Sequence, residues 1–495
     1  QYDFSFHHRS DGVNNTLSYG LGFSDLFFEW AVYVAGTLYS FADEKLKRLV
    51  DYFLDGICKT AVFGKYPDAG AKNRSISRQG ALKAYGAKTA ERLLLTTDYR
   101  RDEIQEIADI RNSGQKPTRS HATFYWQSEH FTFQRPSFFT SVRMYSTRIH
   151  NMEQPYNSEG LLNHHRGDGT NHISITGDEY YDIAPVFDYQ KIPGATIVQK
   201  PKLPSGKEIQ KLGMTDFVGA VTDGLYGAVA FDFKSPHDPL CARKSWFFFD
   251  EEYICLGAGI SSRVDLPVVT TVNQCLLRSG VTISIGNKNS VLSKGERELD
   301  NVDWVYQDGV GYAFLKPSRV SIKNNEATGS WFLINKQTDS PKAEITKDVF
   351  TLWLDHGVKP DAVSYEYMVV PATSVAELEQ NPPRDKIAIL ANTTELQAVR
   401  HSGLGMFQAV FFRAGEVQLT DGIKLACDSP GIVMLKTEGD NITEISVSDP
   451  NRELARLHLR LSAKIQTQGE NFRAAWNNDE EVSEVVISLP QGVYA

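Results

Sequence analysis

The spacing of apolar residues changes near Pro117, and this change limits what the chain can fold into. Before it, apolar residues recur three and four positions apart, as on one side of a helix. After it, short runs such as HATFYWQ, HISITG and VSYEYMVV alternate with turn residues, at a spacing close to that of sandwich sheets. The sequence therefore predicts an α+β multidomain protein, with helices first and antiparallel sheets after them.

The first 115 residues predict paired helices. The first helix carries one apolar stripe, which we expect to face the core: Phe23, Leu26, Phe27, Trp30, Ala31 and Val34. Asp43 is the expected N-cap of a second helix, a third is expected over 79–95, and a fourth over 99–111. Helices joined by short loops favour an antiparallel helical array.

Three domains follow from these patterns. Residues 1–117 form the helical domain, 118–381 a large antiparallel β-sandwich domain, and 382–495 a small C-terminal β-sandwich domain. The stretch NPPR, at 381–384, is the expected linker between the last two.

Composition excludes several classes of protein. A net charge of −9 argues against general binding of nucleic acid, although 52 Lys and Arg residues leave room for a local basic groove. The chain contains no run of about 18 uncharged apolar residues, so no membrane-spanning helix is predicted. The five cysteines form no CxxC pair, which argues against a zinc site or a disulfide scaffold. The chain begins with Gln1, so we expect a processed or trimmed product in which a signal peptide would not be visible.

Three polar clusters lie on predicted loops. They are FHHRSDGVNNTLSYG with His7, His8, Arg9, Asn14, Asn15 and Tyr19; NRSISR with Arg74 and Arg78; and RIHNMEQPYNSEG with Arg148, His150, Glu153, Asn157 and Glu159. The His pair has no HExxH spacing and predicts no metal site. Glu153 and Glu159 could form the acid and base of a glycosidase, but the sequence does not give the distance between them.

Together these side chains suit the removal of a proton next to a carboxylate. The C5 proton of a uronic acid is weakly acidic, and its abstraction becomes feasible when amide or guanidinium donors neutralise the sugar carboxylate. A phenol can act as the base where nearby cations lower its pKa from about 10. The protonated phenol can then donate to the leaving glycosidic oxygen.

Ordered matches along the whole chain resemble polysaccharide lyase family 8, which includes chondroitin, hyaluronan and xanthan lyases. They are QYDFSFHH, LSYG, RSISR, FQRPSFFTSVRMYSTR, NSEG, EYYDIAPVFDYQKIPGAT, DFVGAVTDGLYGA, KSWFFFDEEYICLGAGI and ILANTTELQAV. The resemblance implies an incomplete α/α toroid followed by antiparallel β-sandwich domains. It also implies β-elimination on chondroitin sulfate or hyaluronan by a secreted or periplasmic bacterial lyase, whose partner is the acidic polysaccharide itself.

The resemblance also implies roles for particular residues. Tyr19 matches the family's general base and acid, and His8 matches a histidine that contacts the uronate. The spacing from His8 to Tyr19 is longer than in the family, which leaves His7 as an alternative. Arg74 and Arg78 match the paired arginines near the leaving oxygen. Glu153 matches a Glu that orients the Arg–Tyr network, and Asn157 an Asn close by.

This sequence departs from the family pattern in two places. The first half of the toroid, which carries the family's carboxylate-neutralising Asn, is absent, so either this piece alone is inactive or the missing half is a separate segment. Some members hold calcium after a PVW-like stretch. Here, over 185–190, only Asp188 keeps a carboxylate, so we expect no calcium site, and the elimination requires no cofactor.

Three other functions stay open. One is a relative that binds acidic polysaccharide but has lost activity. The second is a glycoside hydrolase built on Glu153 and another acid. The third is a purely structural sandwich protein, which would bind no acidic glycan at low salt.

Overall fold

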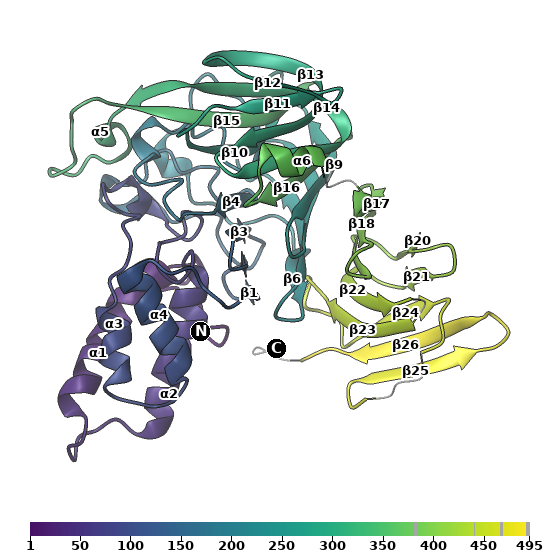
Figure 1. Cartoon of the computed structure of the whole chain (residues 1–495), viewed down its shortest axis with the longest axis horizontal. Helices are drawn as coiled ribbons and strands as arrows, with labels where there is room; N and C mark the ends of the chain where they lie inside the picture. Colours follow the sequence, from purple (N-terminus) through teal and green to yellow (C-terminus); the bar gives the residue numbers. More distant parts are fainter. Residues whose placement is uncertain (381–384, 440, 466–468, 492–495) are drawn as a thin grey trace.

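The computed structural model describes residues 1–380, 385–439, 441–465 and 469–491. Helices come first in the chain and sheets follow (Figure 1). The large sheet lies above the helices and the C-terminal strands lie to one side of them (Figure 1). The expected linker at 381–384 lies outside the described residues.

The helical part contains four α-helices and three short helical turns. The α-helices are α1 (Leu21–Val34), α2 (Asp43–Asp51), α3 (Lys88–Leu94) and α4 (Arg101–Ser113), and the turns are η1 (Thr16–Gly20), η2 (Tyr52–Cys58) and η3 (Arg74–Ser77). The third helix is much shorter than predicted, because residues 79–87 form turns and irregular chain. Phe28, Val50, Phe53 and Ile57 are fully buried at the centre of this part.

Most of the predicted apolar stripe of α1 does not face the core, which corrects that expectation, and Ala31 is its buried member. Leu26 and Trp30 are 60% and 59% exposed. The buried positions are Ser24, Phe28 and Ala31, and Phe28 packs edge-on against Phe53 with ring centroids 5.8 Å apart. Because α1 is apolar around most of its circumference and is covered on one side only, the sequence pattern identified the wrong side as buried.

The central part holds two sheets within the described residues, all of whose strand pairs are antiparallel. A four-stranded sheet runs in sequence order: β1 (His121–Tyr125), β2 (His130–Gln134), β3 (Phe139–Arg143) and β4 (Thr170–Ser174). The twelve-stranded sheet consists of β5 (Thr196–Val198), β6 (Val218–Thr222), β7 (Gly227–Lys234), β8 (Leu240–Phe248), β9 (Tyr253–Ser262), β10 (Pro267–Leu276), β11 (Thr282–Ile285), β12 (Lys288–Val291), β13 (Gly295–Gln307), β14 (Val310–Gly329), β15 (Ile345–Val358) and β16 (Val363–Pro371). Two short helices, α5 (Trp331–Ile334) and α6 (Val375–Gln380), follow β14 and β16.

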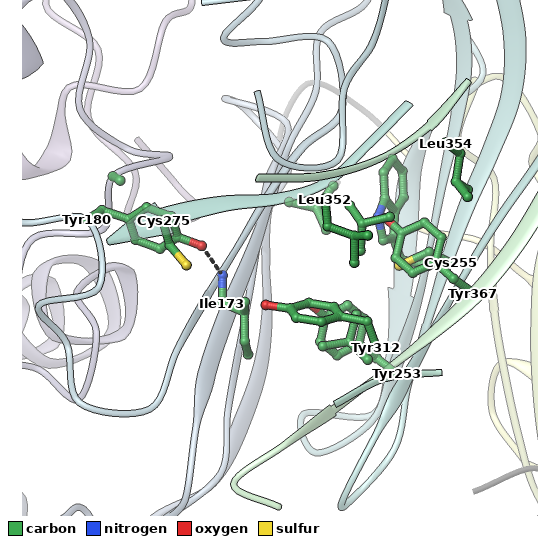
Figure 2. Packing of buried hydrophobic residues seen from close by; sticks show 14 of the residues in the cluster. Ile173, Tyr180, Tyr253, Cys255, Cys275, Tyr312, Leu352, Leu354 and Tyr367 are labelled. Carbon is green, nitrogen blue, oxygen red and sulfur yellow. Dashed lines mark hydrogen bonds between the residues drawn. The ribbon is translucent and has the colours of Figure 1, made fainter. Parts of the chain in front are cut away.

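Aromatic side chains fill the core between these sheets. Phe131 and Phe133 of β2 lie 4.9 and 5.2 Å from Phe248 of β8, measured between ring centroids. Figure 2 shows the tyrosine-rich region of this core, where the backbone N–H of Ile173 donates to the hydroxyl of Tyr180 at 3.1 Å.

The C-terminal part packs two five-stranded antiparallel sheets, counted over the described residues. One contains β17 (Ile387–Asn392), β18 (Leu396–His401), β19 (Met406–Phe411), β22 (Gly431–Glu438) and β23 (Asn441–Ser448); the other contains β20 (Gly415–Gln418), β21 (Lys424–Cys427), β24 (Arg456–Leu461), β26 (Val482–Ser488) and β25 (Phe472–Asn477). Alternate residues of β24, namely Leu457, Leu459 and Leu461, enter a shared core, as expected for a sandwich.

Candidate active site

Tyr19 lies in the π-helical turn η1, immediately before α1. Local hydrogen bonds stabilise this turn. Asn14 Oδ1 accepts the backbone N–H of Thr16 at 3.0 Å, and Asn15 Oδ1 accepts the Ser18 hydroxyl at 2.9 Å. The neighbouring Leu17 is buried, whereas Tyr19 is 44% exposed. The phenol is therefore fixed at its backbone and open to solvent at its ring.

A second loop, residues 68–78, is attached to this turn from the other side. The ammonium group of Lys72 donates to the carbonyl of Leu17 at 2.7 Å, and Asn73 Nδ2 donates to the carbonyl of Asn14, also at 2.7 Å. Burial lowers the pKa of Lys72 to about 8. These contacts fix the position of the segment that carries Arg74 relative to Tyr19.

Arg74 connects the phenol to a buried carboxylate. Its Nη2 donates to the Tyr19 hydroxyl at 2.7 Å, and its Nη1 forms an ion pair with Glu153. Burial raises the pKa of Glu153, and the adjacent guanidinium opposes part of that rise. Tyr19 and Glu153 are thus held by opposite sides of one planar group.

Glu159 joins the two arginines and is itself fully buried. Its carboxylate accepts two hydrogen bonds from Arg78, at 3.1 and 2.7 Å, and lies 3.7 Å from Arg74 Nε. The hydrogen bonds to Glu159 raise the pKa of Arg78, whose side chain is 51% exposed. One carboxylate therefore orients both guanidinium groups.

The segment before Glu159 has an unusual backbone. Asn157 and Ser158 both have φ of 59°, a region that non-glycine residues rarely occupy. Gly160 also has positive φ, and a Cβ there would lie 2.8 Å from the Cα of Arg74. This close approach brings the carboxylate of Glu159 under the arginine pair, at a cost of about 1–3 kcal/mol for each strained residue.

His8 lies against the phenol, with its ring centroid 4.0 Å from that of Tyr19. Both of its ring nitrogens are buried without a hydrogen-bond partner among the described residues. Burial and the nearby Arg9 lower its pKa below 6.5, so the ring is neutral at pH 7. His7 instead interacts through Nδ1 with the carbonyl of Arg9 at 3.1 Å.

The structure brings together five of the residues singled out from the sequence: Tyr19, His8, Arg74, Arg78 and Glu153. Asn157 lies nearby on the exposed turn η4 (Tyr156–Ser158), with no side-chain hydrogen bond among the described residues.

Sequence reasoning assigned no role within this network to Glu159 or Lys72. The order RxxxR followed by two glutamates could have suggested the bridging role of Glu159, since two guanidinium groups that are close together need two anions. No sequence signal pointed to Lys72.

The residues after η5 (Ala184–Val186) do not fit a calcium ion. Asp188 accepts the backbone N–H of Gln190 at 2.9 Å and lies 3.5 Å from the ammonium group of Lys191. Across the ranges that the structure describes, no three His, Cys, Asp or Glu side chains are arranged to hold a metal ion. In the same ranges, no helix is both long and apolar enough to cross a membrane.

Comparison with known proteins identifies the class of protein that this fold and site define. Residues 120–382 match the super-sandwich domain of polysaccharide lyase family 8, and residues 388–458 match the C-terminal β-sandwich domain of the same family. The chain belongs to polysaccharide lyase family 8.

Its curated relatives are longer than this chain. Chondroitinase-AC from Pedobacter heparinus is 34% identical over 447 residues, which are 88% of this chain and 62% of the relative. Hyaluronate lyase from Thermasporomyces composti is 33% identical, covering 72% of this chain and 44% of the relative, and xanthan lyase from Bacillus sp. is 31% identical, covering 66% and 36%. The chain thus spans about three fifths or less of the length of these relatives.

Solved structures agree with this assignment. A structure of chondroitinase AC lyase with oligosaccharides superposes over 100% of this chain and 71% of that chain, with a TM-score of 0.88 and 29% identity. Xanthan lyase from Paenibacillus covers 98% of this chain and 50% of that chain, with a TM-score of 0.83 and 20% identity, and supports the fold alone.

Proposed function

We propose that the protein to which this chain belongs is a polysaccharide lyase that cleaves uronic-acid-containing glycosaminoglycans by β-elimination. One observation carries the proposal: the guanidinium group of Arg74 contacts the Tyr19 hydroxyl and the buried Glu153 at the same time. Relatives named chondroitinase, hyaluronate lyase and xanthan lyase support the reaction class.

In this mechanism the Tyr19 phenolate removes the C5 proton of a uronate. The electron pair of that C–H bond forms the C4=C5 double bond, the C4–O bond breaks, and the departing oxygen takes the proton from the Tyr19 hydroxyl. The phenolate is thereby restored, and no cofactor takes part. Arg74 stabilises the phenolate by its charge-assisted hydrogen bond.

The other residues of the site support this cycle. Neutral His8 is positioned to contact the sugar beside Tyr19, because its ring nitrogens have no protein partner among the described residues. Arg78, oriented by Glu159, is available to the departing oxygen through its exposed portion. His7 and Asn157 lie at the edge of the site, where they can contact substrate.

Chondroitin sulfate and hyaluronan are the proposed substrates, since both alternate a uronate with an amino sugar. Two relatives are named for acting on one or the other. Such polymers are too large to enter a cell intact, which favours a secreted or periplasmic bacterial location.

A glycoside hydrolase built on Glu153 and Glu159 is disfavoured by their surroundings. Both carboxylates are buried and each is bound to a guanidinium group, whereas a hydrolase needs its two carboxyl groups facing the glycosidic bond. A relative that only binds polysaccharide would need no phenol held by a cation, which is why we favour activity.

The helices are proposed to be the second half of an α/α toroid whose other helices cover α1. The exposed Leu26 and Trp30 support this, because such an apolar face is unusual on a surface left in water. A neighbouring hollow is lined by Phe6, Phe23, Phe27, Leu49 and Tyr52. The partner of this face would be further helices of the same protein or of a separate segment.

The test is incubation with a panel of glycosaminoglycans, using this chain alone and joined to a helical segment that covers α1. Products are followed by the ultraviolet absorbance of the conjugated uronate and by size. A lyase gives absorbing products. New reducing ends without that absorbance would indicate a hydrolase, and binding without products would indicate the inactive relative.

A further inference from the structure

Arg9 differs from the other two arginines of the site. Arg74 and Arg78 are each paired with a buried carboxylate, Glu153 and Glu159. Among the described residues Arg9 has no ion pair, and its Nη1 is buried without a hydrogen-bond partner. Such an atom costs free energy unless something binds it.

The neighbouring groups explain why Arg9 stays in place without a carboxylate. Its guanidinium carbon lies 3.8 Å from the centre of the Tyr156 ring, and that of Arg74 lies 5.7 Å from the same ring. The nearby Asp11 uses its carboxylate to accept the N–H of Val13 and the side-chain amide of Gln210. Stacking thus holds Arg9 flat and leaves its hydrogen-bonding edge unused.

Arg9 is also adjacent to the reacting groups. It directly follows His8, whose ring lies 4.0 Å from that of Tyr19. Its positive charge contributes to the lowered pKa of His8 and opposes part of the rise in the pKa of Glu153. Arg9 and Arg74 also lie over the same ring, that of Tyr156, and Arg74 donates to the Tyr19 hydroxyl, so the cation of Arg9 is close to the reacting groups.

We propose that Arg9, held on the ring of Tyr156, binds the carboxylate of the uronate whose C5 proton is removed. The inference rests on the proposed function and adds a residue that recognises the substrate by its carboxylate. When the C5–H bond breaks, negative charge moves onto that carboxylate, and a guanidinium group that makes two parallel hydrogen bonds stabilises it there. The cation needs no counter-charge from the protein, because the substrate supplies it.

The decisive experiment measures binding, not turnover. A Tyr19→Phe protein, which does not consume its ligand, is compared with the same protein carrying Arg9→Gln. The ligands are a hyaluronan oligosaccharide, which has carboxylates and no sulfate, the same oligosaccharide with its carboxyl groups methyl-esterified, and a chondroitin sulfate oligosaccharide of the same length. Arg9→Gln should weaken binding of the native oligosaccharide about tenfold or more and binding of the ester less than about twofold.

The controls distinguish binding of the carboxylate by Arg9 from a structural role of Arg9. Arg400→Gln is the matched variant, since Arg400 is also partly buried and lies over an aromatic ring, Phe407, at 5.8 Å in the remote C-terminal part. It should change neither affinity. Arg9→Lys keeps the charge without the flat fork and should weaken native binding less than Arg9→Gln does. Thermal melting of each variant checks that it is folded.

Several outcomes would overturn the inference. Equal weakening for the native and esterified ligands would make Arg9 a structural residue. Weakening confined to a chondroitin sulfate oligosaccharide would make it a sulfate site. If the Tyr19→Phe protein did not bind the native oligosaccharide, Arg9 would not be a binding site for its carboxylates. The proposed function is judged separately, by cleavage with the unsubstituted protein. Without cleavage, the expected binding pattern would still establish the Arg9 site.

Discussion

Replacing Tyr19 with Phe removes one oxygen atom and separates chemistry from stability. The hydroxyl receives one hydrogen bond, from Arg74, and the side chain is 44% exposed. Arg74 keeps its contacts with Glu153 and Glu159 after the change, so no buried charge is left unpaired. We therefore expect the free energy of unfolding to fall by no more than about 1 kcal/mol.

Activity should respond very differently. The same oxygen is the proposed proton acceptor and donor, and its loss should lower kcat by about 10³-fold, which corresponds to about 4 kcal/mol in the barrier. Binding should change by less than about threefold, because Arg74 and Arg78 remain in place. The assay follows the ultraviolet absorbance of the unsaturated product over a range of polysaccharide concentrations, alongside thermal melting.

The matched control is Tyr33→Phe. Tyr33 is on α1, and its hydroxyl donates to Glu29 at 3.2 Å. Its side chain is 67% exposed and lies outside the candidate site. This substitution should leave kcat unchanged. A Tyr19→Phe enzyme that keeps more than about a tenth of the kcat, or that loses only affinity, would refute the assignment of the base.

Other variants test the remaining parts of the structure. Arg74→Ala leaves the buried Glu153 without its cation, while Glu159 keeps Arg78, and should cost about 3–5 kcal/mol of stability, seen as a lower denaturation midpoint, together with activity. Glu159→Gln should lower kcat more than it changes KM, because it loosens the arginine pair without removing it; an unchanged kcat would contradict this. Burial lowers the pKa of His172 to about 3, so below pH 6.5 the unfolded chain binds a proton that the folded chain does not. Stability should therefore fall on acidification, by up to about 1.4 kcal/mol per pH unit, and His172→Gln should make melting less pH-dependent. Trp30→Ser should barely change the melting temperature of this chain, whereas Phe28→Ala should cost about 3–5 kcal/mol.

The sequence predicted the order of helices and sheets because the two periodicities are different and long enough to distinguish. It failed on the buried side of α1, since a helix that is apolar nearly all round gives no direction. The predicted third helix also included residues 79–87, which form turns and irregular chain instead.

For the site, residue types and the family resemblance pointed to Tyr19, Arg74 and Glu153, which the structure places in contact. What could not be predicted is how charges pair across about 80 positions of chain. The bridging contacts of Glu159 come directly after the left-handed turn at Asn157 and Ser158, which no local sequence pattern predicts.

The candidate site straddles a boundary between units of the fold. Tyr19 and the arginines come from the helical part, while Glu153 and Glu159 come from a loop between β3 and β4. An engineer who exchanged helical parts between relatives at the domain junction would therefore separate the cations from their counter-ions. A working chimaera would have to carry residues 147–160 along with the donor helices, even though that stretch folds with the recipient's sheets.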